Sequence, residues 1–183
     1  MIYIYPTETA YALGCDATNN QAVDRIFAIK NRPKRQTLPL IMADIDMVKR
    51  YAHINKEAEK LIKEYWPGPL TLILDAKQSD LAEGVIAPDN SIAVRISNHP
   101  AATQLSQTIG KPFVSTSANA SGNDTCYDVS RIKEQIDTTD IHMIDVGPLP
   151  KNIPSTIADI RKKLKVIRYG SVQIRPPKKI IAD

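Results

Sequence analysis

Apolar residues recur along this chain with two different periods, one typical of helices and one typical of strands. In residues 20–30 they follow the pair Asn19 and Asn20 at helical spacing, which predicts a capped helix. Residues 2–5 are β-branched and aromatic, and Pro6 ends the run, so the pattern predicts a short strand. The two patterns alternate up to residue 169, with no internal repeat and no linker, and indicate an α/β protein.

The further elements follow from the same two patterns. Helices are predicted over 44–52, 55–65, 100–109 and 128–136. Strands are predicted over 39–43, 70–74, 92–96, 112–116, 141–146, 156–160 and 166–169. The run Trp66-Pro67-Gly68-Pro69 separates a helix from the next strand, because two prolines cannot continue a helix. This interleaving predicts a sheet with mixed strand directions.

The composition is that of an ordinary globular protein. Of the 183 residues, 43% are hydrophobic and 24% are charged, which excludes disordered and collagen-like chains. No apolar run approaches the roughly 20 residues that a membrane-spanning helix needs. The start of the chain lacks the basic region and the long apolar stretch of a secretory signal. We therefore expect one cytoplasmic domain over residues 1–183.

Cysteines, histidines and charge add little chemistry on their own. Cys15 and Cys126 stand apart and the three histidines are scattered, so we expect neither a disulfide framework nor a metal site. The formal net charge is +4, and eight basic residues fall late in the chain: Arg161, Lys162, Lys163, Lys165, Arg168, Arg175, Lys178 and Lys179. The tail from about 171 to 183 is either a solvated basic segment or a contact for a polyanion.

Several common nucleotide-binding and catalytic motifs are absent from the sequence. The seven glycines never stand two apart, which excludes G-x-G-x-x-G, and no G-x-x-x-x-G-K-[ST] is present. H-E-x-x-H and G-x-S-x-G are also missing. A nucleotide, if one binds, must be held by a less common arrangement.

Polar clusters stand at the ends of predicted elements, and each has two interpretations. Residues 6–14 place hydroxyls and a carboxylate beside apolar side chains, as in a pocket wall or in a self-bonded turn. Lys30 and Arg32 follow a helix, where they either complement the helix dipole or grip two phosphates from a turn stiffened by Pro33.

Two further clusters and one arginine complete the candidates. The hydroxyl-rich residues 115–122 either offer hydroxyl and N–H donors to an anion or form an ordinary loop. Residues 154–156 and 168–170 are individually weak signals. Arg95 lies among apolar neighbours in a predicted strand, so it requires a partner, either a structural carboxylate or a phosphate of a ligand.

In this order the clusters resemble the motifs of the YrdC-like family, the threonylcarbamoyl-AMP synthases. The matching patterns are P-T-E-T-x-Y-x-L-G, K-x-R-P, W-P-G-P-L-T, A-V-R, S-T-S-A-N-x-S-G, P-S-T and R-x-G, at residues 6–14, 30–33, 66–71, 93–95, 115–122, 154–156 and 168–170. The resemblance extends from residue 2 to about 170, in the short, single-domain form. It implies a twisted mixed β-sheet with flanking helices and a positively charged concave cavity.

The resemblance also implies an enzyme. The family's activity is that of a nucleotidyltransferase, which makes threonylcarbamoyl-AMP and pyrophosphate from L-threonine, ATP and bicarbonate or CO2. The product serves the t6A modification at position 37 of tRNA. ATP is then a substrate that carries Mg²⁺, and tRNA or the t6A transfer machinery is the expected downstream partner.

The family's site residues carry over position by position. Lys30 and Arg32 are the expected catalytic pair, because they would neutralise the triphosphate. The implied nucleotide-binding residues are Lys30, Arg32, Arg95, Ser115, Asn119 and Arg168, and the implied threonine-binding residues are Thr9, Ser117 and Ser155. No residue matches a general base, so we expect catalysis by positioning, without a metal ligand from the protein.

Three departures from the family pattern stand out. Many relatives carry a histidine that helps to hold threonine in a P-L-I-x-H run, where this chain has Ala43. Relatives usually have a helix before the first strand, and this chain starts at the strand itself. The C-terminal extension of the longer relatives is also missing.

Two other functions remain as alternatives. One is a module that binds structured RNA with little or no synthase activity, although RNA binding does not require the set Lys30, Arg32, Ser117 and Asn119. The other is the carbamoyl-transfer step of hydrogenase maturation. Similar domains occur there beside acylphosphatase-like and cysteine-rich zinc modules, neither of which is recognised in this sequence.

Overall fold

Helices begin where the sequence provides a side chain that caps free N–H groups. The computed structural model describes residues 1–174, and in this range four of the five helices follow a capping Asn or Asp. Asn19, for example, accepts a hydrogen bond from the N–H of Ala22 at 3.0 Å. The helices are α1 (Asn20–Lys30), α2 (Ile45–Tyr51), α3 (Lys56–Tyr65), α4 (Pro100–Ile109) and α5 (Val129–Gln135).

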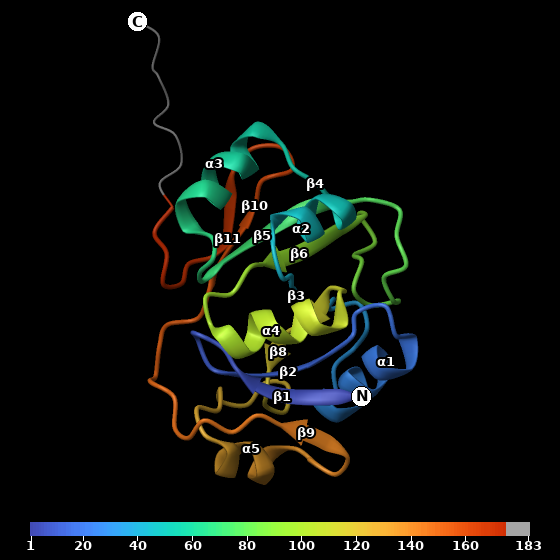
Figure 1. The fold of residues 1–183 in the computed structure, drawn as a ribbon, viewed down its shortest axis with the longest axis vertical. Coiled ribbons are helices and arrows are strands. Elements are labelled where there is room, and N and C mark those ends of the chain that lie inside the picture. Colours follow the sequence, from blue (N-terminus) through green and yellow to red (C-terminus); the bar gives the residue numbers. More distant parts are fainter. Residues whose placement is uncertain (175–183) are drawn as a thin grey trace, which may run out of the picture.

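The strands form two mixed sheets, which Figure 1 shows in the upper and lower halves of the molecule. The smaller has the order β8-β2-β1-β9 and consists of β1 (Ile2–Pro6), β2 (Tyr11–Cys15), β8 (Thr116–Ser117) and β9 (Ile141–Met143). The larger has the order β11-β10-β5-β6-β3-β7, with β4 beside β5. It consists of β3 (Leu40–Ile41), β4 (Ala52–His53), β5 (Leu70–Ala76), β6 (Ser91–Arg95), β7 (Phe113–Val114), β10 (Thr156–Asp159) and β11 (Lys165–Arg168).

One short segment, residues 113–117, runs from one sheet to the other. β7 pairs with β3 in the larger sheet, and β8 pairs with β2 in the smaller sheet. Ser115 stands between β7 and β8, and its N–H donates to Pro39 O at 2.9 Å. A Cβ atom on Gly14 of β2 would lie 2.0 Å from Val114 O, so only glycine allows this close approach. Side chains of this segment therefore stand at the boundary between the sheets.

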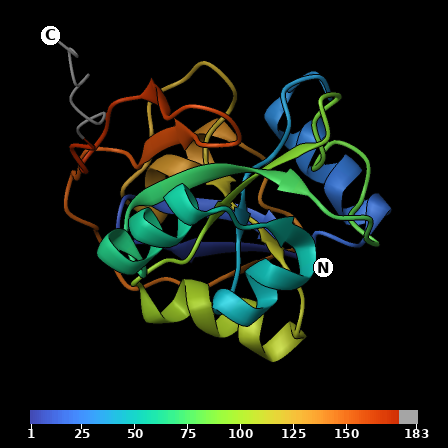
Figure 2. The ribbon, with the colours of Figure 1, turned by 90° about the horizontal axis from the view of Figure 1, so that it is seen from above.

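Apolar side chains of both sheets are buried together with one face of each helix. The larger cluster includes Ile4, Leu13, Leu72 and Val94 from the strands, with Ile26 from α1. A smaller cluster lies under α4, where the Tyr5 and Phe113 rings meet edge to face at 5.5 Å. Figure 2 shows α2, α3 and α4 on the same side of the larger sheet.

The structure confirms the mixed α/β class with flanking helices, and each predicted helix lies within one residue of its observed bounds. Three strands were missed. β2 overlaps the polar run 6–14, β8 straddles the end of the predicted strand 112–116 and was not separated from it, and the two-residue β4 follows α2 directly. All five residues of β2 are buried, so the strand lacks the alternation by which strands are recognised.

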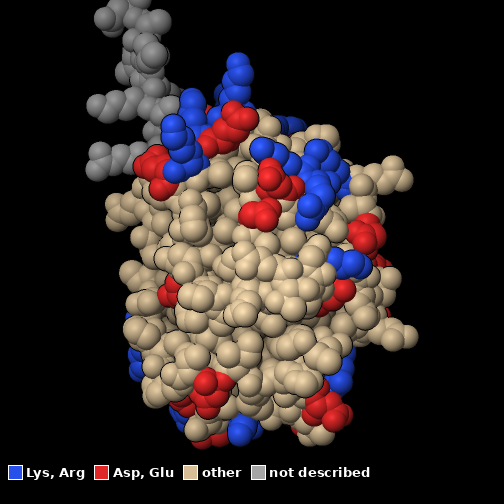
Figure 3. Space-filling model, in the orientation of Figure 1, with Lys and Arg blue, Asp and Glu red and all other residues tan. Residues whose placement is uncertain are grey.

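The surface shows no single region of one charge on the face seen in Figure 3. Acidic and basic side chains are interspersed near its ends, and its centre, over α4, carries neither. Within residues 1–174 no helix is long and apolar enough to cross a membrane. The predicted basic tail lies, from residue 175 onward, outside the described residues.

Candidate functional site

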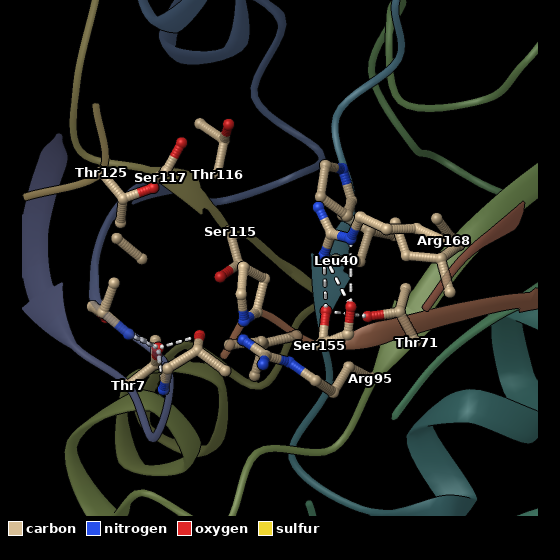
Figure 4. Close-up of a pocket in the computed structure, with 18 of the residues that line it drawn as sticks. Thr7, Leu40, Thr71, Arg95, Ser115, Thr116, Ser117, Thr125, Ser155 and Arg168 are labelled. Carbon is tan, nitrogen blue, oxygen red and sulfur yellow. Dashed lines mark hydrogen bonds between the residues drawn. The ribbon is translucent and has the colours of Figure 1, made fainter. Parts of the chain in front are cut away.

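A cavity of about 400 Å³ opens between the two sheets, beside the crossing segment 113–117. Its wall carries hydroxyl groups from Thr7, Thr9, Thr71, Ser115, Thr116, Ser117, Thr125 and Ser155, guanidinium groups from Arg32, Arg95 and Arg168, and apolar side chains that include Leu40, Ile73 and Ile167. Figure 4 shows Arg95 and Arg168 approaching the cavity from one side, with Ser117 and Thr125 on the other. Among residues 1–174, no Asp or Glu is part of this wall. The predicted positive charge of the cavity as a whole stays a prediction.

Arg168 reaches the cavity from the edge strand β11. Its Nη2 donates to Ser155 O at 2.8 Å and to Ser155 Oγ at 3.1 Å, and its Nε donates to the same carbonyl at 3.1 Å. Ser155 Oγ lies 3.1 Å from Thr71 Oγ1 on β5, and Figure 4 marks this contact with a dashed line. Burial and then the nearby Arg95 lower the pKa of Arg168. Arg168 is therefore held by neutral oxygens, and its charge has no carboxylate partner within residues 1–174.

A close backbone contact joins the motifs P-S-T and R-x-G, which were weak signals in isolation. A Cβ atom on Gly170 would lie 2.1 Å from Pro154 O, so glycine is required for this approach. Thr156 Oγ1 accepts hydrogen bonds from the N–H groups of Gly170 at 3.0 Å and Val172 at 3.1 Å. These contacts fix Arg168 against Ser155, and the two motifs form one unit.

Arg32 enters the cavity wall from the turn after α1. Asn31 adopts a left-handed conformation with φ of 48° and ends the helix. Arg32 Nε then donates to Gln36 O at 2.8 Å, and Nη2 donates to Thr37 O at 3.0 Å. Burial lowers the pKa of Arg32. Like Arg168, it is held by carbonyl oxygens, with no carboxylate partner in residues 1–174.

Lys30 is buried behind the wall, only two residues from Arg32. Its Nζ donates to Ser117 O at 2.6 Å, Asn119 O at 2.7 Å and Asn119 Oδ1 at 3.1 Å. Asn119 Oδ1 also accepts from Ser117 Oγ at 2.6 Å. Burial, and then the charge of Arg32, lower the pKa of Lys30 to about 8. The three donors of the ammonium group thus hold the loop that carries Ser117 and Asn119.

Arg95 on β6 has a carboxylate partner. Its Nη1 donates to Glu8 Oε1 at 2.7 Å, and Ser97 Oγ donates to Glu8 Oε2. Of the two partners that the sequence allowed, a structural carboxylate is therefore present. This pairing does not test whether Arg95 also contacts a ligand.

The turn that carries Glu8 is fixed from within. Thr7 Oγ1 donates to Ala10 O at 2.7 Å and accepts from the N–H groups of Thr9 and Ala10, each at 3.2 Å. Thr7 and Thr9 also line the cavity. Both interpretations of residues 6–14 hold, because the self-bonded turn is itself part of the wall.

Seven of the nine site residues carried over from the family line the cavity, namely Thr9, Arg32, Arg95, Ser115, Ser117, Ser155 and Arg168. Lys30 and Asn119 lie behind this wall instead, and hold each other. Ala43 is buried two residues after the end of β3 and is not part of the wall. These positions bring the candidates together, while the role of each stays a prediction.

Sequence reasoning missed other residues of the wall, which include Thr71, Thr125, Tyr127 and Asn152. Thr71 ends the W-P-G-P-L-T motif and is the one polar residue among residues 70–74 of β5, a signal that could have indicated it. The other three stand in irregular segments, where no periodicity marks them. Among residues 1–174 no group of three or more His, Cys, Asp or Glu side chains is arranged to hold a metal ion.

Known proteins are similar to this chain in fold and in sequence. The model of a family named for Sua5, YciO and YrdC, with the description "Telomere recombination", matches residues 1–170. A threonylcarbamoyl-AMP synthase of Pseudoalteromonas translucida is 38% identical over 162 residues, which cover 86% of each chain. The crystal structure of P. abyssi Sua5 complexed with L-threonine aligns with a TM-score of 0.84 and 31% identity, over 92% of this chain and 50% of that one. The crystal structure of E. coli YciO gives a TM-score of 0.79 and 28% identity, over 96% and 85%.

Proposed function

Because the chain belongs to the family of Sua5, YciO and YrdC, we propose that it is an L-threonylcarbamoyl-AMP synthase, a nucleotidyltransferase. The observation that carries the proposal is the cavity, whose wall combines three arginines with a set of hydroxyl groups. Guanidinium groups suit phosphate, and hydroxyls beside apolar walls suit a small polar amino acid. The threonine bound to P. abyssi Sua5 supports the same substrate class.

The proposed reaction has two steps. The neutral amine of L-threonine attacks CO2, which is supplied directly or formed from bicarbonate and a proton with release of water. An N–C bond forms, one C–O π bond opens with its electron pair going to oxygen, and the nitrogen loses a proton to water. A carbamate oxygen then attacks the α-phosphorus of ATP, the bond to the bridging oxygen breaks, and pyrophosphate leaves with the electron pair. Both reactants in this second step are anions, so charge neutralisation and alignment lower the barrier.

The side chains divide these tasks. Arg32 and Arg168 have no carboxylate partner in residues 1–174 and are suited to the phosphates. Thr9, Ser117 and Ser155 would contact threonine, and Ser115 and Asn119 would contact the nucleotide. Lys30 supports this set by holding the loop of Ser117 and Asn119.

The remaining reactants and partners follow from the same proposal. Mg²⁺ would arrive with ATP and would supply charge neutralisation on the phosphates, and since no Asp or Glu is part of the described wall, this chain would hold it there through the nucleotide. The product, threonylcarbamoyl-AMP, is a mixed anhydride of a carbamate and a phosphate and is labile. The t6A transfer machinery for position 37 of tRNA therefore has to consume it promptly. These steps belong to the cytoplasm, where we expect the protein to act.

A direct assay tests the synthase. The purified chain is incubated with ATP, Mg²⁺, L-threonine and labelled bicarbonate, and the label is followed into an AMP adduct together with pyrophosphate release. We expect an adduct that depends on threonine. If folded protein binds ATP without forming an adduct, the proposal fails and RNA binding becomes the leading alternative. A steep fall of tRNA affinity with salt, without preference for sequence, would then mark an electrostatic binder.

A further inference from the structure

Glu8 and Arg95 form an ion pair that is almost fully removed from solvent. The side chains are 12% and 9% exposed, and the contact between Glu8 Oε1 and Arg95 Nη1 is 2.7 Å. The pair Arg131 and Glu134 has a similar distance of 2.6 Å, but its side chains are 68% and 59% exposed. Water screens the exposed pair of Arg131 and Glu134 much more than the buried pair of Glu8 and Arg95. Only the buried pair should therefore strongly restrict where its two side chains can lie.

Glu8 is also anchored by contacts other than Arg95. Ser97 Oγ donates to its second carboxylate oxygen, and Asn152 Nδ2 donates to its backbone oxygen at 2.9 Å. The turn around it is closed by Thr7. The carboxylate is therefore a fixed point, and Arg95 is the group whose position depends on it.

The pair spans a wall between two hollows. Arg95 faces the main cavity, whereas Glu8 lines a second, more open hollow of about 420 Å³. Thr9 and Asn152 belong to both linings. Glu8 thus stands behind Arg95 as seen from the main cavity, and its effect on a ligand there passes through Arg95.

We infer that Glu8 is a positioning residue that assigns Arg95 to the amino-acid end of the cavity and withholds it from the triphosphate. This inference rests on the proposed function. Arginine has five N–H groups, and Glu8 accepts a hydrogen bond from one of them at Nη1, so others remain for a singly charged carboxylate or carbamate. A polyphosphate would compete with Glu8 for Arg95, while Arg32 and Arg168 have no such competitor within residues 1–174.

The experiment is a double-mutant cycle read by calorimetric binding of ATP alone and L-threonine alone. Glu8→Gln should bind L-threonine about tenfold more weakly and ATP about threefold or more tightly, because Arg95 is released toward the phosphates. Once Arg95 is replaced by Gln, adding Glu8→Gln should change neither affinity, so the double variant should bind both ligands as Arg95→Gln does. Glu134→Gln, in the exposed pair, should change neither affinity.

The inference would be overturned if the changes in affinity caused by Glu8→Gln and by Arg95→Gln simply multiplied in the double variant. It would also be overturned if Glu8→Gln weakened the binding of ATP and of L-threonine equally. If Glu8→Gln does not fold, Ser97→Ala removes only one anchor of the carboxylate and should shift the two affinities in the same opposite directions, by about two- to threefold. Unchanged affinities in Ser97→Ala would then count against the inference. The experiment measures binding and not turnover, so its result is separate from that of the synthase assay. Wild-type protein that binds ATP but forms no adenylate would refute the proposed synthase. The effect of Glu8→Gln on ATP affinity would still decide the role of Glu8.

Discussion

Lys30 and Arg32 belong to one K-x-R-P motif but to two different regions of the molecule. Arg32, with Arg168, lies in the cavity wall and is held by carbonyl oxygens. Lys30 lies behind the wall, and its ammonium group donates to three oxygens of the loop that contains Ser117 and Asn119. The first region keeps its cations available to a ligand, whereas the second uses its cation to build the site.

This difference separates binding from support within a single motif. A guanidinium has donors left over after two or three hydrogen bonds, so Arg32 and Arg168 can be anchored and still meet an anion. An ammonium group has three donors, and those of Lys30 are all used. Substitutions in the two regions should therefore produce different losses, one in ligand affinity and the other in stability.

Replacing Arg32 and Arg168, the two cavity arginines that have no carboxylate partner within residues 1–174, should produce the largest loss of ATP affinity. In Arg32→Gln/Arg168→Gln two charge-assisted contacts disappear, each worth about 1.5–3 kcal/mol, which together weaken ATP binding about 10²–10⁴-fold. The melting temperature should fall by only a few degrees, since both side chains lie at the cavity wall and lose hydrogen bonds to carbonyl oxygens but no ion pair within residues 1–174. Calorimetric titration with ATP measures the affinity. Arg35→Gln, at an exposed position of the same segment, is the control, and wild-type affinity in the double variant would contradict the assignment.

Removing the lysine should instead lower stability. Lys30→Met leaves Ser117 O and Asn119 O without their donor in a buried place, at a cost of about 1–3 kcal/mol. The melting temperature at pH 7 should fall by about 2–12 °C. Lys34→Met is the matched control, because Lys34 is 45% exposed and pairs with Asp24 on the surface. Loss of ATP affinity in Lys30→Met at unchanged melting temperature would show that Lys30 contacts the nucleotide.

Much of the fold could be predicted because its elements have strong local signals. α1, α2, α3 and α5 follow a capping Asn or Asp and show helical periodicity. β2 and β8 could not be found in this way, since one is buried at every residue and the other has only two residues. The division into two sheets arises because the chain passes from one sheet to the other at Ser115, between β7 and β8. No periodic pattern in the sequence marks such a tertiary feature.

The site could be predicted as a set of motifs but not as an arrangement. The resemblance identified Lys30 and Arg32 together, and nothing in their spacing distinguishes a side chain in the wall from one behind it. The burial of Arg95 required a partner, and chemistry alone left a carboxylate and a phosphate equally suitable. Glu8 is 87 residues away along the chain, so only the folded structure could select it.

The titration of Lys30 offers a smaller test of the supporting region. Burial lowers its pKa from the ordinary 10.5 to about 8, so the buried ammonium is penalised fully below about pH 8. Between that value and the ordinary pKa the folded protein has lost this proton while the unfolded chain retains it. The contribution of Lys30 to the free energy of unfolding therefore rises with pH, by up to about 1.4 kcal/mol per unit. Urea unfolding of wild type and Lys30→Met at pH 7, 8 and 9 should show a widening difference, and a constant difference would mean an ordinary pKa.

The smallest expected effect lies where the two regions meet, at Ser117. Its hydroxyl donates to Asn119 Oδ1 at 2.6 Å and also lines the cavity. Ser117→Ala removes one neutral hydrogen bond, worth about 0.5–1.5 kcal/mol, while Asn119 Oδ1 keeps its bond to Lys30. We expect L-threonine to bind about 2- to 12-fold more weakly, with little change in ATP affinity or melting temperature. Calorimetric titration with each ligand measures the difference, with Ser121→Ala, at an exposed position of the same loop, as the control. A selective loss of ATP affinity would instead assign Ser117 to the nucleotide and would contradict its proposed contact with threonine.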